Sequence, residues 1–202
     1  MIVPEPSAMP IRQTRSRLLG RGRYEYREYG FTLNSAGRGD RHLVRHVVHR
    51  GDSAYVLPVD RPGQRVGLCR QFRAGKFLAG SPDGYTLEAP GGLVEPGADP
   101  AETARRECLE ELGVVVTCLE HVATLMPHPT LMPERAHLFI GECLLGEHDG
   151  GPRGVGSDEE TELAVMPLDL LRSATTDQPV DDMRTFLLLV LLENADLRRH
   201  HG

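Results

Sequence analysis

Long apolar runs are missing from the sequence. The longest, residues 186–192, spans seven residues, whereas a helix that crosses a bilayer needs about 20. The first ten residues contain three prolines and no apolar run, which is not the pattern of a secretory signal. We therefore expect a soluble cytoplasmic protein that does not bind a membrane.

Cysteine and lysine are also scarce. The four cysteines, Cys69, Cys108, Cys118 and Cys143, stand singly, and no pair has the spacing of a zinc or redox site. They are expected to be free thiols that pack as small apolar side chains in a reducing compartment. Lys76 is the one lysine, so 22 of the 23 basic residues are arginines. Codon bias in a GC-rich genome explains this most simply, although arginine also suits bidentate phosphate contacts.

Acidic residues outnumber basic residues. The 202 residues include 23 basic and 29 acidic ones, which gives a formal net charge of −6. This balance argues against a general nucleic-acid binder, which would need a basic surface, and it is compatible with an enzyme that gathers carboxylates around divalent cations. Hydrophobic residues make up 40% and charged residues 26% of the chain, which is typical of a globular fold. The length suits one domain with an additional arm.

Strand patterns dominate the chain. Residues 11–34 carry alternating apolar positions, which predicts a β-arm, and the glycines within residues 35–40 predict a turn. The expected strands are 42–49, 54–59, 65–72, 85–89, 114–125, 136–145 and 162–166, and the expected helices are 100–112, 168–173 and 180–198. Residues 146–157 are rich in glycine and predict a loop. This order favours an α/β fold with a mixed β-sheet and helices packed on it.

The helix expected over residues 100–112 has sequence signals at both ends. Asp99 is a good N-cap, and Pro100 follows it at the first helical position, where its missing N–H costs nothing. Glu102, three residues after Asp99, completes a capping-box pattern. Gly113 suits the position after the helix, where a left-handed residue is common. The bounds of this helix therefore follow from local chemistry as well as from helix propensity.

One face of this helix is acidic. Glu107, Glu110 and Glu111 fall within an arc of about 100°, next to an apolar arc. Crowded like charges destabilise a helix, and a hard divalent cation between the carboxylates would reverse that effect. The alternative is a solvated acidic face, which is common on helices. The glycines at 91 and 92 favour the cation, because they allow the backbone to approach a ligand just before the helix.

Residues 92–114 resemble the signature of the Nudix hydrolases, G-x5-E-x7-R-E-U-x-E-E-x-G-U, in which U is apolar. The matching positions are Gly92, Arg106, Glu107, Glu110, Glu111, Gly113 and Val114. Ala98 stands where the family has a glutamate that helps to order the loop. The similarity covers roughly residues 43–170. It implies a Nudix-type α/β/α sandwich over residues 43–202, preceded by an N-terminal extension and β-arm over residues 1–42.

The stretches 56–60, 70–73 and 87–92 are similar to the ADP-ribose pyrophosphatase and nucleotide-sugar pyrophosphatase branch of that family. In this branch the N-terminal β-arm is exchanged between subunits, so we expect a homodimer, with a plain N-terminal extension as the alternative. The resemblance also implies Mg²⁺ or Mn²⁺ as the cofactor. The implied metal ligands are Glu107 and Glu111, with Glu110 assisting, and the carbonyl of Gly91.

The resemblance further implies a set of substrate-binding residues. Arg70 and Arg73 match positions near the diphosphate, although two exposed strand arginines are the alternative. Glu88 either supports the metal site or pairs with an arginine. Pro129 lies in the triplet His-Pro-Thr, which replaces the Ser-Pro-Gly of the branch, and Glu134 follows it. The substrate loop is therefore altered.

The general base of this branch often comes from a late acidic loop. Here residues 156–162 form a glycine-flanked acidic stretch in which Glu159 or Glu160 is the candidate. The alternative is a solvated acidic turn. The resemblance implies hydrolysis of a nucleoside diphosphate sugar, preferably ADP-ribose, to AMP and ribose 5-phosphate. GDP-mannose or another nucleotide sugar is the second possibility, and a non-catalytic Nudix module that senses a nucleotide metabolite is the third.

Overall fold

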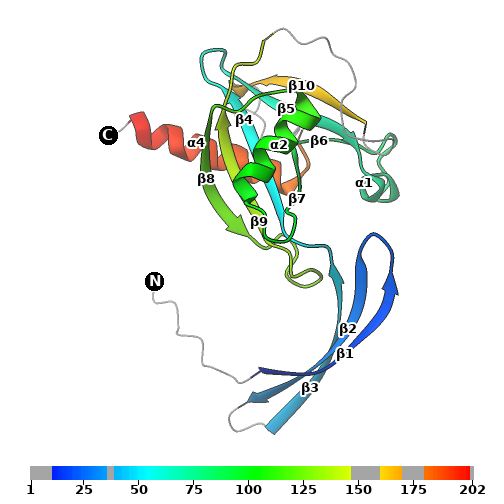
Figure 1. Ribbon diagram of the computed structural model, residues 1–202. Helices are drawn as coiled ribbons and strands as arrows, with labels where there is room; N and C mark the ends of the chain where they lie inside the picture. Colours follow the sequence, from blue (N-terminus) through cyan, green and yellow to red (C-terminus); the bar gives the residue numbers. More distant parts are fainter. Residues whose placement is uncertain (1–10, 36–38, 147–159, 170–179, 201–202) are drawn as a thin grey trace. The chain divides into compact units, whose positions relative to one another are not determined.

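The computed structural model describes residues 11–35, 39–146, 160–169 and 180–200 (Figure 1). The chain divides into two compact units. The first consists of residues 1–51 and 126–134, and the second of residues 52–125 and 135–202.

The first unit contains a three-stranded antiparallel sheet. Its strands, in spatial order, are β1 (Ile11–Arg21), β2 (Glu25–Ser35) and β3 (Gly39–His49). Glu28 on β2 forms ion pairs with two arginines of β1. Its Oε1 lies 3.2 Å from Arg15 Nη2, and its Oε2 lies 3.4 Å from Arg17 Nη2. The β-arm expected over residues 11–34 is therefore two strands, and the strand expected over 42–49 is the later part of β3. The domain boundary expected at residue 43 lies inside β3.

Seven strands form one mixed sheet among the described residues of the second unit. Their order is β10-β5-β4-β9-β8, with β6 paired to β5 and β7 paired to β4. The strands are β4 (Ser53–Asp60), β5 (Arg65–Phe72), β6 (Tyr85–Glu88), β7 (Gly91–Leu93), β8 (Cys118–Leu125), β9 (Ala136–Glu142) and β10 (Thr161–Pro167). Strands β4 and β9 are parallel, and the other pairs are antiparallel. The predicted mixed sheet is confirmed.

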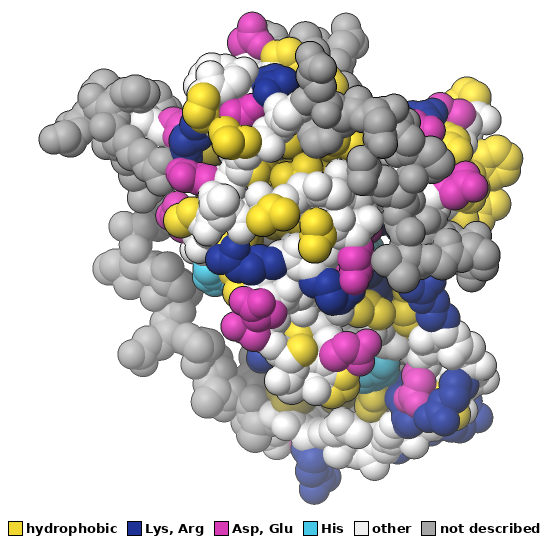
Figure 2. All heavy atoms as spheres, turned by 45° about the horizontal axis from the view of Figure 1, so that its top comes forward, with side chains coloured by type: hydrophobic (Ala, Val, Ile, Leu, Met, Phe, Trp, Pro, Cys, Tyr) yellow, Lys and Arg dark blue, Asp and Glu magenta, His cyan; other side chains and the backbone are white. Residues whose placement is uncertain are grey.

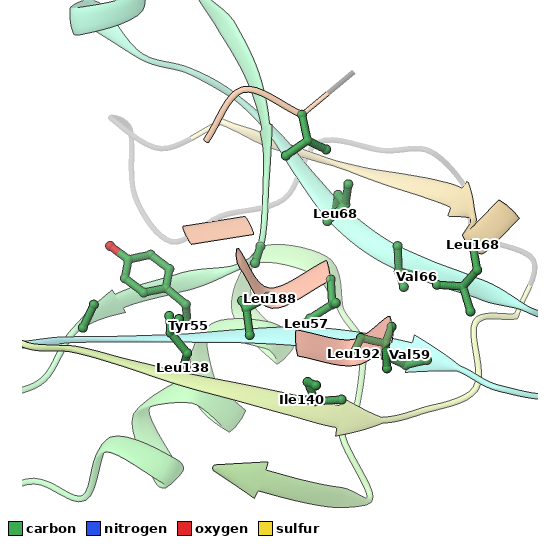
Figure 3. Close-up of a cluster of buried hydrophobic side chains, with 13 residues drawn as sticks. Tyr55, Leu57, Val59, Val66, Leu68, Leu138, Ile140, Leu168, Leu188 and Leu192 are labelled. Atoms are coloured by element: carbon green, nitrogen blue, oxygen red, sulfur yellow. The ribbon is translucent and has the colours of Figure 1, made fainter. Parts of the chain in front are cut away.

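Helices cover both faces of this sheet. Strand β4 alternates its side chains between two apolar clusters, as the pleat of a strand requires. Its residues 55, 57 and 59 join a cluster that includes Leu188 and Leu192 of α4 (Met183–His200), as Figure 3 shows. Its residues 54 and 56 join a second cluster with Ala104 and Cys108 of α2 (Pro100–Leu112). The expected α/β/α sandwich is therefore the observed architecture.

Several element bounds differ from those expected. The helix over 100–112 is confirmed in full, with Asp99 accepting a hydrogen bond from the Ala101 amide and Gly113 in the left-handed region at φ 67°. Strand β8 begins at residue 118 and not at 114, because Cys118 pairs with Glu142, the last residue of β9, so that residues 114–116 have no partner in β9. Helix α1 (Ala74–Leu78) and strand β7 were not expected. Of the helix expected over 168–173, residues 170–173 lie outside the described residues.

Charged side chains of both signs mix on the surface. Figure 2 shows Lys and Arg side chains interspersed with Asp and Glu side chains on the face that it draws. Among the described helices, none has both the length and the apolar character that crossing a bilayer would require.

The turn between β4 and β5 is held by a buried carboxylate. Asp60 is 3% exposed, and its oxygens accept hydrogen bonds from Arg65 Nη2 at 2.6 Å and from the Gly63 amide at 3.0 Å. The Leu145 amide adds a third, longer bond at 3.3 Å. The hydrogen bond from Arg65, followed by the one from the Gly63 amide, holds the pKa of Asp60 below its ordinary value.

A lowered pKa links this turn to the pH dependence of stability. We expect Asp60→Asn to lower the free energy of unfolding at pH 7 by about 1–3 kcal/mol, because the buried donors lose a charged acceptor. The stabilisation by Asp60 is complete above the ordinary aspartate pKa of about 3.9 and is lost as the pH falls through the lower pKa of the folded state. Urea unfolding of both proteins should thus show a larger difference at pH 7 than at pH 3. A difference of equal size at both pH values would contradict a role for the Asp60 charge.

Candidate active site

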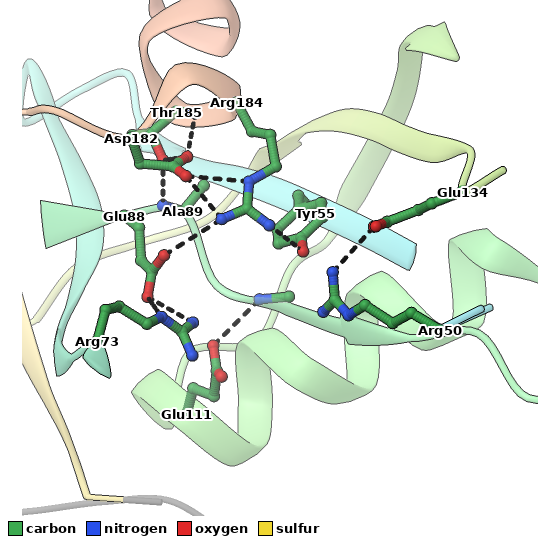
Figure 4. A network of polar contacts seen from close by, with 11 residues as sticks. Arg50, Tyr55, Arg73, Glu88, Ala89, Glu111, Glu134, Asp182, Arg184 and Thr185 are labelled. Carbon is green, nitrogen blue, oxygen red and sulfur yellow. Dashed lines mark hydrogen bonds and ion pairs between the residues drawn. The ribbon is translucent and has the colours of Figure 1, made fainter. Parts of the chain in front are cut away.

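Helix α2 brings its acidic face against strand β7. The buried side chains Ala104, Cys108 and Leu112 fix the rotation of the helix on the sheet. This rotation buries Glu111, which is 6% exposed, and its Oε2 accepts a hydrogen bond from the Gly91 amide at 3.1 Å (Figure 4). The predicted metal-binding helix and the predicted glycine loop are therefore in direct contact.

Both glycines of this loop are needed for close approach. A Cβ atom at Gly92 would lie 2.2 Å from Glu107 Oε1. A Cβ atom at Gly91 would lie 2.4 Å from the Ala54 carbonyl oxygen of β4. The backbone of β7 thus lies between strand β4 and the carboxylates of α2. A side chain at Gly91 would meet the backbone of β4, whereas one at Gly92 would fit only if the Glu107 side chain moved.

Negative charge accumulates at this contact. Burial, followed by the nearby Glu107 carboxylate, raises the pKa of Glu111 to about 8, against the opposing effect of the Gly91 amide. Burial also raises the pKa of Glu88, on β6, against the opposing effect of Arg73. A site where burial and neighbouring carboxylates disfavour a second negative charge is one that a cation would stabilise.

Arg106 contacts two of the three acidic residues. Its Nη2 lies 2.7 Å from Glu107 Oε1, and its Nη1 lies 2.6 Å from Glu110 Oε2. Within the described part of the chain, no three His, Cys, Asp or Glu side chains converge on one point as a ready-made cation site. The structure therefore brings Glu107 and Glu111 to the two glycines, and it pairs both Glu107 and Glu110 with Arg106.

Two carboxylates beside a backbone loop fit a magnesium ion. Mg²⁺ is commonly held by one or two carboxylates, while water and substrate phosphates supply the other ligands. Glu107 and Glu111 provide hard oxygen donors, and Gly91 brings backbone groups next to them. The roles of these residues, and of Glu110, as metal ligands remain predictions.

Arg73 and Glu88, both expected near the substrate, bind each other. Arg73 Nε donates to Glu88 Oε1 at 2.6 Å. Arg184 Nη2, from α4, lies 3.5 Å from Glu88 Oε2. Of the two alternatives for Glu88, the structure shows the pairing with arginine. The Arg73 side chain remains 43% exposed, so part of its guanidinium is open to a ligand.

Arg70 lies on β5 with a different set of neighbours. Its guanidinium carbon lies 3.9 Å from the centroid of the Tyr85 ring, and its Nη1 donates to Glu162 Oε2 at 3.1 Å. Cation–π contact and an ion pair therefore hold this side chain on the surface of the sheet.

Glu159 and Glu160 are the two candidates for the general base. Glu159 lies outside the described residues, and Glu160 is an exposed residue directly before β10. The next residue, Thr161, is fully buried, and its hydroxyl donates to the backbone carbonyl of Glu111 at 3.0 Å. This bond holds the start of β10 against the last turn of α2.

Pro129 and Glu134 belong to the first unit. Glu134 is 2% exposed and accepts a hydrogen bond from Arg50 Nη1 at 3.0 Å. A role of Pro129 and Glu134 in substrate binding stays a prediction.

Sequence reasoning missed the residues at the start of α4 that join this site. Arg184 donates hydrogen bonds to Glu88 and Tyr55, and the Thr185 hydroxyl accepts one from the Ala89 amide. Asp182, directly before the helix, accepts hydrogen bonds from both Arg184 and Thr185. The signal that could have found them is Asp182, a residue type favoured at the N-cap position, directly before the last helix. That signal predicts a helix start, but it gives no indication of which strand the helix start contacts.

Comparisons with known proteins agree with this geometry. A family model of the NUDIX domain matches residues 49–187. The GDP-mannose pyrophosphatase of Cronobacter sakazakii is 36% identical over 159 residues, which cover 77% of this chain and 82% of the relative. That of Yersinia enterocolitica is 30% identical over 182 residues, covering 90% and 94%. A crystal structure of an ADP compounds hydrolase superposes with a TM-score of 0.68 at 18% identity, covering 94% of this chain and 95% of that one, which shows the shared fold.

Substitution by alanine is expected to have a different effect at each of the two glycines. We expect Gly91→Ala to destabilise the fold by about 1–3 kcal/mol, because the new methyl group meets the rigid backbone of β4. Gly92→Ala should leave the melting temperature nearly unchanged and weaken Mn²⁺ binding at least about tenfold, because the flexible Glu107 side chain moves away.

Thermal unfolding and Mn²⁺ titration of each variant measure the two effects. Gly146→Ala is the matched control, since a Cβ atom there meets nothing within 4 Å. Equal Mn²⁺ affinity of the Gly92→Ala and Gly146→Ala proteins would contradict a role for Glu107 in cation binding.

Proposed function

The chain belongs to the Nudix hydrolase family, and on that premise we propose that it hydrolyses the pyrophosphate bond of a nucleoside diphosphate sugar with Mg²⁺ or Mn²⁺. The observation that carries the proposal is the buried Glu111 carboxylate, held beside Glu107 and bonded to the Gly91 amide. This arrangement concentrates hard oxygen donors at a backbone loop, where a diphosphate and its cation would be held together.

GDP-mannose is the first candidate substrate. The relatives that match most of the chain at 30–36% identity are named GDP-mannose pyrophosphatases. Hydrolysis of GDP-mannose would add water across the phosphoric anhydride and give GMP and mannose 1-phosphate. ADP-ribose, which the signature-flanking stretches favour, would give AMP and ribose 5-phosphate and is the competing substrate.

The residues of the chain divide the work of this reaction. A bound divalent ion would neutralise the diphosphate and lower the pKa of an attacking water. Glu107 and Glu111 would hold the ion, and the Gly91 amide orients Glu111 for that task. Arg73 and Arg70 would donate to phosphate oxygens, a role that suits the forked guanidinium group. Glu160 or Glu159 would accept the proton of the water.

Two further expectations complete the proposal. The sheet of β1, β2 and β3 is the expected dimerisation element, which would make the enzyme a homodimer. The cytoplasm, where nucleotide sugars and Mg²⁺ occur together, is the expected compartment.

A substrate screen tests the proposed activity. GDP-mannose, ADP-ribose, NADH and dinucleoside polyphosphates would be incubated with the full-length protein and Mg²⁺, and the products identified by chromatography. We expect the highest kcat/KM for GDP-mannose. Absence of Mg²⁺-dependent turnover of every compound would contradict the proposed function, and a higher kcat/KM for ADP-ribose would reverse the order of the two substrates.

The Glu111→Gln variant tests the site itself. We expect kcat to fall at least about 100-fold, because the charge that acts on the developing transition state is removed while the side chain keeps its size. Glu120→Gln, an exposed position on β8, is the matched control and should keep wild-type activity. A Glu111→Gln enzyme with the wild-type rate would remove Glu111 from the mechanism.

A further inference from the structure

The first turn of α4 contacts the strand segment that leads into Gly91. We propose that Thr185, together with Asp182 and Arg184, is a positioning element of the divalent cation site: it fixes the backbone at Ala89–Gly91 and through it the Glu111 carboxylate. This inference rests on the proposed function only for the identity of the cation.

Thr185 makes the first connection. Its side chain is fully buried, and its hydroxyl accepts a hydrogen bond from the Ala89 amide at 2.7 Å. The same hydroxyl donates its one proton to Asp182 Oδ2 at 2.9 Å. Asp182 Oδ2 also accepts the Thr185 amide at 2.8 Å, as an N-cap residue does. The Thr185 hydroxyl is thus fixed in direction by the helix start, and Ala89 is held two residues before Gly91.

Arg184 makes the second connection. Its Nη1 donates to the Tyr55 hydroxyl, and its guanidinium carbon lies 4.3 Å from the centroid of the Tyr55 ring (Figure 4). The Cδ1 atom of the same ring lies beside Gly91, since a Cβ atom at Gly91 would be 2.4 Å from it. Tyr55 and Gly91 are also paired across β4 and β7. Arg184 is itself held by Asp182 Oδ1, at 2.6 Å from Nη2 and 3.0 Å from Nε.

Residues 89–91 are therefore each held by a contact with β4 or with the first turn of α4. The Ala89 amide bonds to Thr185, the Pro90 carbonyl accepts the Val56 amide at 3.0 Å, and Gly91 lies against Tyr55. The Gly91 amide then bonds to Glu111. A change in the first turn of α4 would reach Glu111 through this backbone without any direct contact between them.

The polar network does more than attach the helix. Leu188 and Leu192 already bury α4 against the sheet, and apolar contacts of this kind tolerate small shifts. Directed hydrogen bonds between buried groups do not tolerate such shifts, because a buried donor that loses its partner keeps the full cost of having left water. The network of Asp182, Arg184 and Thr185 therefore sets where the loop lies.

The test replaces the hydroxyl of Thr185 with a methyl group. Thr185→Val keeps the shape of the side chain and removes both hydrogen bonds of the hydroxyl. We expect the dissociation constant for Mn²⁺, measured by electron paramagnetic resonance on the full chain without substrate, to rise about tenfold, as for other residues that orient metal ligands. The Mg²⁺ concentration for half-maximal hydrolysis should rise in parallel, while KM for the sugar nucleotide at saturating Mg²⁺ stays within about twofold. Thr185→Ser, which keeps the hydroxyl, should restore Mn²⁺ binding.

Thr103→Val is the matched control. Thr103 is also buried and its hydroxyl donates to the Asp99 carbonyl at 3.2 Å, at the far end of α2. We expect this variant to lose a similar amount of thermal stability and to bind Mn²⁺ with wild-type affinity. Arg184→Lys, which keeps the charge but not the forked contacts to Asp182 and Tyr55, gives a second measurement should Thr185→Val fold poorly, and it too should weaken Mn²⁺ binding.

Wild-type Mn²⁺ affinity in both Thr185→Val and Arg184→Lys, with stability lowered as in Thr103→Val, would overturn the inference and leave the network a structural role only. The Mn²⁺ titration needs no substrate. Failure of the substrate screen would therefore contradict the proposed function and leave this test intact.

Discussion

The rest of the site depends on one interaction, the hydrogen bond that a buried carboxylate accepts from a backbone amide. Glu111 is buried because the apolar arc of α2 packs on the sheet, and its Oε2 meets the Gly91 amide. One neutral donor does not compensate a buried charge beside other acids. The pKa of Glu111 is accordingly raised to about 8, chiefly by burial. The fold thus holds an acidic group in surroundings that favour a cation, and the glycines of β7 let the backbone come close enough to share it.

Local chemistry explains why this part of the chain could be predicted. Helix α2 has a cap at each end, so its bounds follow from residues within one turn of them. The acidic and apolar arcs follow from helical periodicity, and the strands of the mixed sheet follow from short apolar runs between turns. Glu107, Glu111 and the two glycines are together in the structure because only six residues, 94–99, separate β7 from the start of α2, and a turn closed by the Ala98 amide and the Glu95 carbonyl lies among them.

Long-range contacts explain what could not be predicted. Arg184 and Tyr55 are 129 residues apart in the sequence, and no local pattern pairs them. Strand β7 is three residues long and contains two glycines, so it has no strand signal of its own and exists because β4 offers it an edge. Its pairing is decided by the sheet and not by its residues.

The bond between Ala89 and Thr185 spans 96 residues, which has a consequence for synthesis on the ribosome. Translation runs from the N-terminus, so α2 is complete while the residues that clamp its loop are still unmade. At about 5–20 residues per second, the interval between Leu112 and Thr185 lasts roughly 4–15 s. During that time the nascent chain carries the acidic helix next to a loop fixed from the β4 side alone. On the proposed positioning role of Thr185, the cation site would be complete only after the start of α4 has been made.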